Sequence, residues 1–117
     1  MARVVAVFDD LLLGSNVLGM LRAAGHEATL TGAADVDATG AAVLIVDLAA
    51  TSFDGVALIE RMRATGDLAD TRTLGVYSHV DAETRRRAAD AGVDLVVPRS
   101  RLAREGSQLV QQLVSNS

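Results

Sequence analysis

The chain lacks several residue types that define common classes of protein. It has no cysteine, which excludes a disulfide framework and a thiolate metal site and agrees with a cytoplasmic location. Only 3% of its 117 residues are aromatic, so stacked bases or a flavin ring would find few partners. Acids outnumber basic residues, for a net charge of -4 and a pI near 5.0. Nucleic-acid binding needs a concentrated basic face, so we expect no nucleic-acid partner.

Long hydrophobic runs are also missing. The first apolar run, Val4 to Phe8, is far too short to span a bilayer, and Met1 precedes it so closely that no signal peptide is expected. We therefore expect a cytoplasmic protein with no membrane partner. Half of the residues are hydrophobic, and 117 residues are typical of one domain, so residues 1–117 are predicted to form a single domain with a real core.

One stretch organises the rest of the chain, the run AAVLIVDLAATSFDG that begins at Ala41 and ends at Gly55. Its aliphatic residues from Val43 to Val46 lead directly into Asp47. A continuous apolar run this short predicts a strand buried on both faces, because a half-exposed strand would alternate with polar residues. Asp47 is therefore expected at the carboxyl end of a central parallel strand, where open α/β sheets bind their ligands.

Strand-like and helix-like segments alternate along the whole chain. The predicted strands are Arg3 to Phe8, Glu27 to Thr31, Val43 to Val46, Thr73 to Ser78 and Asp94 to Val97. The predicted helices are Leu11 to Ala24, Gly55 to Ala64, Asp81 as a cap to Ala91, and Ser100 or Arg101 to Leu113, with one turn around Ala33 to Val36. This alternation predicts an α/β fold, a doubly wound five-stranded parallel sheet with helices on both faces.

Five landmarks at strand ends resemble the receiver domain of bacterial response regulators. They are Asp9-Asp10 after the first strand, Asp47 after the third, Asp54-Gly55 seven and eight residues later, Ser78 after the fourth and Arg99 after the fifth. The resemblance covers essentially the whole chain, and it depends on order and spacing together. It implies a flavodoxin-like sheet with strand order 2-1-3-4-5, which agrees with the alternation of segments.

The resemblance also implies a chemistry for these residues. Crowded carboxylates are costly unless a divalent cation neutralises them, so Asp9, Asp10 and Asp47 imply a Mg²⁺ site. Asp47 would then accept a phosphoryl group as a carboxylate nucleophile. The Ser78 hydroxyl and the Arg99 guanidinium would stabilise charge on the phosphoryl oxygens.

The partners that this resemblance implies are a histidine kinase or a phosphotransfer protein as donor, and a downstream protein as target. The chain would be a stand-alone receiver in a two-component phosphorelay and not an enzyme, since no output module follows Ser117. The family also leads us to expect a homodimer through the last two helices. The apolar face formed by Leu102, Leu109, Val110 and Leu113 would serve either that dimer or the core.

Four departures from the family pattern bear on this function. Where the family has lysine and then proline after the fifth strand, this chain has Pro98 and then Arg99, and arginine is a planar fork and not a point charge. The family's switching aromatic residue falls on Val96, which has no ring. An ungapped count back from Gly25 places the acid pair on Phe8 and Asp9, and a one-residue deletion restores Asp9 and Asp10. The proline usual in the loop after Asp47 is Thr51 here.

Two alternative functions remain open. The first is a degenerate receiver that keeps the fold and binds a partner through its last strand and last two helices without phosphorylation. The second is a small flavodoxin-like nucleotide-binding enzyme, which is disfavoured because the chain has no G-x-G-x-x-G, Walker A loop or aromatic pair.

Some single residues have simpler interpretations. Asp10 serves either as a helix cap or as a metal ligand, and Asp54 is expected to cap the helix that follows it. His26 is expected on the surface at the start of a strand. A Ser-His-Asp catalytic role for His79 is disfavoured, because adjacent strand residues point to opposite faces.

Overall fold

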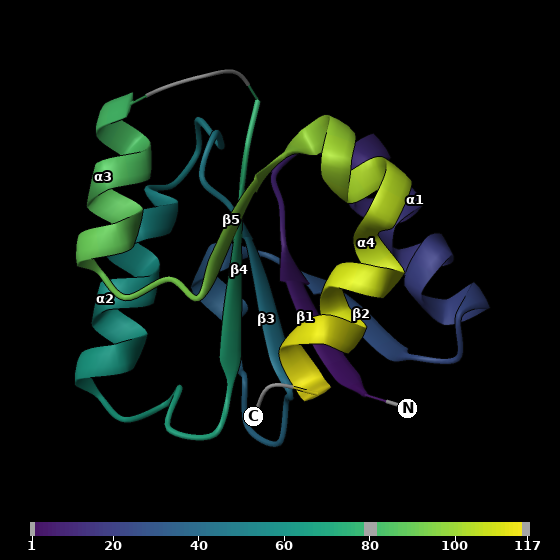
Figure 1. Ribbon diagram of the computed structural model, residues 1–117. Coiled ribbons are helices and arrows are strands. Elements are labelled where there is room, and N and C mark those ends of the chain that lie inside the picture. The colour runs from purple at the N-terminus through teal and green to yellow at the C-terminus, as the bar shows by residue number, and fades with distance from the viewer. Residues whose placement is uncertain (1, 79–81, 116–117) are drawn as a thin grey trace.

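Five parallel strands form one sheet at the centre of the computed structural model, in the order β2-β1-β3-β4-β5 (Figure 1). The structure describes residues 2–78 and 82–115. The strands are β1 (Arg3–Val7), β2 (Glu27–Thr31), β3 (Val43–Asp47), β4 (Arg72–Tyr77) and β5 (Leu95–Pro98). The predicted fold class and strand order are therefore confirmed.

Four helices and one short turn connect these strands. They are α1 (Leu11–Ala23), α2 (Gly55–Ala64), α3 (Ala82–Asp90) and α4 (Arg99–Ser115), with a 3₁₀ turn at Ala33–Asp35 between β2 and β3. Helices α1 and α4 cover one face of the sheet, and α2 and α3 lie on the other (Figure 1). A coil segment with its single turn stands where a full helix would otherwise cover β1, and Ala38 and Ala41 from that segment are buried there.

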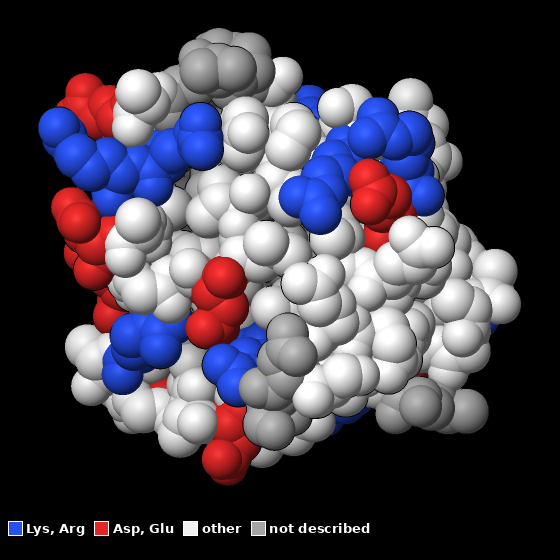
Figure 2. All heavy atoms as spheres, viewed as in Figure 1, with Lys and Arg blue, Asp and Glu red and all other residues white. Residues whose placement is uncertain are grey.

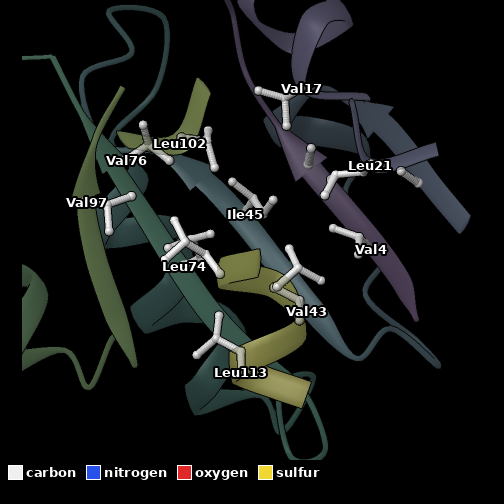
Figure 3. Packing of buried hydrophobic residues seen from close by; sticks show 14 of the residues in the cluster. Val4, Val17, Leu21, Val43, Ile45, Leu74, Val76, Val97, Leu102 and Leu113 are labelled. Atoms are coloured by element: carbon white, nitrogen blue, oxygen red, sulfur yellow. The ribbon is translucent and has the colours of Figure 1, made fainter. Parts of the chain in front are cut away.

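The strand residues are buried in the pattern that a two-sided parallel sheet requires. All five residues of β3 are buried, and their side chains alternate between two hydrophobic clusters. Val43 and Ile45 face the first cluster, with α1 and α4, and Leu44 and Val46 face the second, with α2. Figure 3 shows the first cluster, in which Ile45 lies among Leu102, Leu21 and Leu74.

The apolar face of α4 belongs to the core. Leu102, Leu109, Val110 and Leu113 are all buried in the cluster shared with α1 and the sheet. Of the two uses that the sequence left open for this face, packing inside the domain is the one observed.

Helix α3 is attached to the domain much more lightly. Ala88 is its only buried residue among Ala82–Asp90, and three consecutive arginines, Arg85 to Arg87, are exposed. An element with so little buried apolar surface contributes little to the hydrophobic stabilisation of the fold.

The helix starts follow from their capping residues. The Asp10 carboxylate accepts a hydrogen bond from the Leu13 amide at 3.1 Å, and the Asp54 carboxylate accepts one from the Ala57 amide at 3.1 Å. Each satisfies one amide of a first turn that has no partner within its helix. The cap predicted for Asp54 is confirmed, and of the two roles left open for Asp10 the helix cap is the one observed. Asp81 and His79 lie outside the described residues.

Several predicted boundaries shift by one or two residues. Phe8 and Ser78 follow β1 and β4 instead of ending them. Pro98 is the last residue of β5, which is an edge strand, where proline is tolerated. Helix α4 then begins at Arg99, earlier than predicted.

His26 was expected on the surface, and that prediction is wrong. It is buried, and its Nδ1 atom accepts a hydrogen bond from the Ala2 amide at 3.2 Å. The imidazole turns inward because this bond ties the start of β2 to the residue before β1. No helix among the described residues is long and apolar enough to cross a membrane.

Gly55 is required by the way α2 meets β3. A Cβ atom at this position would lie 2.8 Å from the Asp47 carbonyl oxygen and 2.9 Å from Val46 Cγ1. The backbone oxygen cannot swing away as a flexible side chain would, so α2 approaches the end of β3 only with glycine here.

We predict opposite effects for two alanine substitutions. Gly55→Ala should lower the free energy of unfolding by about 1–3 kcal/mol, because its methyl group forces α2 away from β3. Gly19→Ala, in the middle of α1, should raise it by about 0.5–1 kcal/mol, because no atom lies within 4 Å of the new methyl group. Urea denaturation at pH 7 measures both values. A Gly55→Ala protein as stable as the wild type would contradict this explanation of the glycine.

Candidate functional site

Asp47 is the most deeply buried acid described in the molecule. It is the last residue of β3, its side chain is 0% exposed, and it follows Val43 and Ile45 on the face that α4 covers. Its Oδ1 atom accepts a hydrogen bond from the Ala49 amide at 3.0 Å. Its Oδ2 atom accepts one from Arg99 Nη2, also at 3.0 Å. Both carboxylate oxygens are therefore engaged by the protein itself.

Burial dominates the ionisation of this carboxyl. It raises the pKa of Asp47 above the ordinary value of 3.8, and the nearby charge of Asp9 acts in the same direction. The Ala49 amide and the Arg99 guanidinium oppose this rise in pKa, because both favour the charged form. The Arg99 contact thus compensates part of the cost of burying a carboxylate.

Arg99 joins two of the predicted site acids. As the first residue of α4 it lies at the carboxyl edge of the sheet, and its side chain is 30% exposed. Its Nη2 atom contacts Asp47, and its Nη1 atom lies 3.7 Å from Asp10 Oδ2. Its Nε atom is buried without a hydrogen-bond partner among the described residues. A guanidinium therefore stands between Asp47 and Asp10, where the resemblance placed a divalent cation.

Asp9 is turned toward a different neighbour. Its Oδ2 atom accepts hydrogen bonds from the amides of Thr51 and Ser52, at 2.9 and 3.1 Å, and from the Ser52 hydroxyl at 3.1 Å. The Thr51 hydroxyl lies 3.5 Å away. These hydrogen bonds lower the pKa of Asp9, and the bond from the Ser52 amide has the largest effect. Asp9 therefore fixes the loop between β3 and α2 in place.

Sequence reasoning missed the role of this loop, although a signal for it was present. Thr51 stands where receiver domains usually have proline, which was noted only as a departure from their pattern. Proline has no amide hydrogen, so it could not make the bond that Thr51 donates to Asp9. An acid after the first strand, combined with the absence of proline from this loop, indicates that the acid accepts hydrogen bonds from the loop's amides.

The register between β1 and β3 shows which residue after β1 lies beside Asp47. Val7 of β1 pairs with Val46 of β3, so the next residue, Phe8, lies level with Asp47. Phe8 is buried in the core at 3% exposure. The position beside Asp47 is thus occupied by an aromatic ring, in agreement with the ungapped count that places the family's acid pair on Phe8 and Asp9.

The three predicted metal ligands do not converge on one point. Asp9 binds the β3–α2 loop, Asp10 caps α1, and Asp47 is paired with Arg99. Across residues 2–78 and 82–115, no group of three acid or histidine side chains is arranged to hold a metal ion. The side chains as they lie do not fit the Mg²⁺ site implied by the resemblance, and Asp47 has an arginine as its counter-ion instead.

Ser78 lies at the same edge of the sheet. Asp47 pairs in register with Val76, so Ser78 is two residues further along toward the carboxyl edge, and it is exposed. The structure therefore brings Asp47, Asp10 and Arg99 into one cluster, with Asp9 and Ser78 on neighbouring strand ends.

Comparisons with known proteins agree on the fold. No family model matches the sequence, and no curated protein matches it. Solved structures do match over nearly the whole chain. The chemotaxis protein CheY4 from Vibrio cholerae has a TM-score of 0.85 at 19% identity, covering 97% of this chain and 98% of that one.

Two further structures give the same result. The signal receiver domain of the response regulator NarL from Mycobacterium tuberculosis has a TM-score of 0.81 at 18% identity, covering 99% and 98% of the two chains. A CheY-like receiver domain protein from Methanospirillum hungatei JF-1 has a TM-score of 0.78 at 15% identity, covering 100% and 99%. With the strand order β2-β1-β3-β4-β5, these similarities show that the chain has the CheY-like fold of response regulator receiver domains.

Proposed function

We propose that this chain is a receiver-fold signalling module that binds a partner protein without being phosphorylated, and that it is not an enzyme. The observation that carries the proposal is the ion pair between Arg99 and the fully buried Asp47. Of the functions considered from the sequence, the degenerate receiver is the one this geometry favours.

The chemistry of phosphoryl transfer explains this preference. A carboxylate attacks phosphorus only with an oxygen that the donor can reach, and the Asp47 side chain is 0% exposed beneath the guanidinium. The transfer also requires positive charge on the phosphoryl oxygens, which a divalent cation usually supplies. Here Asp9 is committed to the Thr51 and Ser52 amides, so a cation would have to break those bonds to gain that ligand.

Phosphoryl acceptance at Asp47 is the second candidate. It is favoured by the position of Asp47 at the carboxyl edge of β3, with Arg99 in contact and Ser78 on the next strand end. A histidine kinase or a phosphotransfer protein would then be the donor, and Mg²⁺ the cofactor. This function requires Arg99 to leave the Asp47 carboxylate before the reaction.

The two candidates differ in one measurable product. We predict that intact-mass spectrometry after incubation with acetyl phosphate and Mg²⁺ finds no phosphoryl adduct on the wild-type chain. The adduct should be equally absent from Asp47→Asn, which serves as the control. An adduct on the wild type that Asp47→Asn abolishes would overturn the proposal and establish Asp47 as a phosphoacceptor.

The ion pair also predicts a pH dependence. Arg99→Met removes the positive charge and keeps an apolar side chain of similar length, so it leaves the Asp47 carboxylate buried without its partner. At pH 7 the variant should lose about 2 kcal/mol of stability, less than for a fully buried pair because the Arg99 side chain is 30% exposed.

This loss should shrink as the pH falls. The pKa of Asp47 is already raised above 3.8, and removal of Arg99 raises it further. The folded variant therefore takes up a proton at a higher pH than the wild type does, and the deficit narrows as the pH falls through that range toward 3.8. Urea denaturation at a series of pH values from 7 down to about 4 measures the deficit. Arg101→Met is the control, because Arg101 pairs only on the surface, with Glu105 at 3.6 Å. A deficit for Arg99→Met that does not change with pH would contradict the role of Asp47.

A further inference from the structure

The strand β2 forms one outer edge of the sheet, because it pairs only with β1. An edge strand carries outward backbone groups that can pair with a strand of another chain. The opposite edge strand, β5, has only four residues and ends in Pro98, which has no amide hydrogen. β2 has five residues and no proline, so it is the edge at which an added strand fits better.

The register between β1 and β2 shows which backbone groups of β2 point outward. The Glu27 amide donates a hydrogen bond to the Ala2 carbonyl at 2.8 Å, so the backbone of Glu27 faces β1. Successive residues of a strand alternate in direction, and therefore Thr29 also faces β1 while Ala28 and Leu30 face outward. The amides and carbonyls of these two residues form the outer edge of the sheet.

One of the outward carbonyls is covered by an arginine from the neighbouring helix. Arg22, in the last turn of α1, donates hydrogen bonds to the Ala28 carbonyl from Nη2 at 2.9 Å and from Nε at 3.2 Å. Ala28 is only 4% exposed, although it lies on an outermost strand. A guanidinium held there by two hydrogen bonds occupies the space in which the backbone of an added strand would have to lie.

The surroundings of β2 otherwise carry little charge. Arg22 is the only charged residue of α1. The right side of Figure 2, where α1 reaches the surface, shows mostly uncharged atoms. On the other face of the sheet Glu27 and Thr29 are exposed, and the chain after β2 has a coil with a single 3₁₀ turn instead of a full helix. Charged side chains protect many edge strands, and beside β2 this arginine supplies that protection.

We propose that Arg22 prevents the β2 strand from pairing with the β2 strand of a second copy of the chain. A second copy is the fitting occupant, because two identical edges match each other about a two-fold axis. With the strands antiparallel and Ala28 of each copy opposite Leu30 of the other, each outward amide meets an outward carbonyl. This inference does not depend on the proposed function, since it involves no residue of the Asp47 cluster.

Two obstacles oppose this pairing in the wild type. Each copy has to move the Arg22 guanidinium off the Ala28 carbonyl and lose both hydrogen bonds. The net charge of -4 on each copy also opposes association. A variant without the arginine loses the first obstacle and becomes more negative, so any association that it gains comes from the uncovered edge and not from charge.

The test replaces Arg22 with methionine, which is of similar length and favours helix but donates no hydrogen bond to the carbonyl. Sedimentation equilibrium of Arg22→Met should show a dimer with a dissociation constant about tenfold or more below that of the wild type. In the dimer the Ala28 and Leu30 amides should exchange hydrogen more slowly than in a dilute, monomeric sample of the same variant. An Arg22→Met chain as monomeric as the wild type would contradict the proposal.

Arg22→Gln is the matched control. It removes the same charge but places an amide nitrogen where the Arg22 Nε atom lies, within reach of the Ala28 carbonyl, so this variant should remain monomeric. Both variants should keep the fold, because Arg22 is exposed and contributes no apolar surface to the core. Equal dimerisation of the glutamine and methionine variants would overturn the proposal, since the covering hydrogen bond would then have no effect.

A second substitution tests the register of the dimer. Thr29 lies opposite its own counterpart in the proposed pairing, and it is exposed. Thr29→Lys added to Arg22→Met should therefore place two positive charges face to face and restore the monomer. A dimer that survives this second change, or one in which exchange of the β2 amides is unaltered, would place the contact elsewhere and overturn the proposal.

Discussion

The edge of the sheet depends on one interaction, the contact between the Arg99 guanidinium and the buried Asp47 carboxylate. Asp47 is placed inside the domain by β3, whose other four residues are all apolar and buried. A carboxylate in that position requires either a proton or a positive charge beside it. Because α4 begins immediately after Pro98, its first residue delivers a guanidinium to within 3.0 Å of Asp47 Oδ2 and 3.7 Å of Asp10 Oδ2. The Arg99 guanidinium thus provides the positive charge beside the Asp47 carboxylate.

This arrangement leaves Asp9 to a separate structural task. In a shared metal site the acids after β1 and β3 would turn toward one ion. Here the Asp9 carboxylate instead accepts hydrogen bonds from the amides of Thr51 and Ser52. The loop before α2 is therefore held by a carboxylate, and Gly55 lets α2 begin against the backbone of Asp47. The two acids thus make separate contacts, in which the Arg99 guanidinium compensates the charge of Asp47 and the Asp9 carboxylate holds the loop. The result is a receiver fold in which the carboxylate at the end of β3 is already paired within the protein.

Most of the fold could be predicted from the sequence, because buried strands and capped helices have short-range signals. The apolar run before Asp47, the caps Asp10 and Asp54, and the glycine after Asp54 each reflect local physics, and the structure confirms them. The site was harder to predict, since it depends on register and side-chain direction. Phe8 lies level with Asp47, and Asp9 turns to Thr51. Both arrangements depend on contacts between segments about 40 residues apart in the sequence. His26 was misplaced for the same reason, because its partner is the amide of Ala2.

The central claim is that Arg99 and Asp47 stabilise the fold as a pair, and a double-mutant cycle measures this most directly. Urea denaturation at pH 7 of the wild type, Asp47→Asn, Arg99→Met and the double variant gives the coupling free energy between the two side chains. We predict a favourable coupling of about 1–3 kcal/mol, because each single variant leaves one charged group without its 3.0 Å partner, whereas the double variant removes both charges. Additive effects, with a coupling below about 0.5 kcal/mol, would contradict the account.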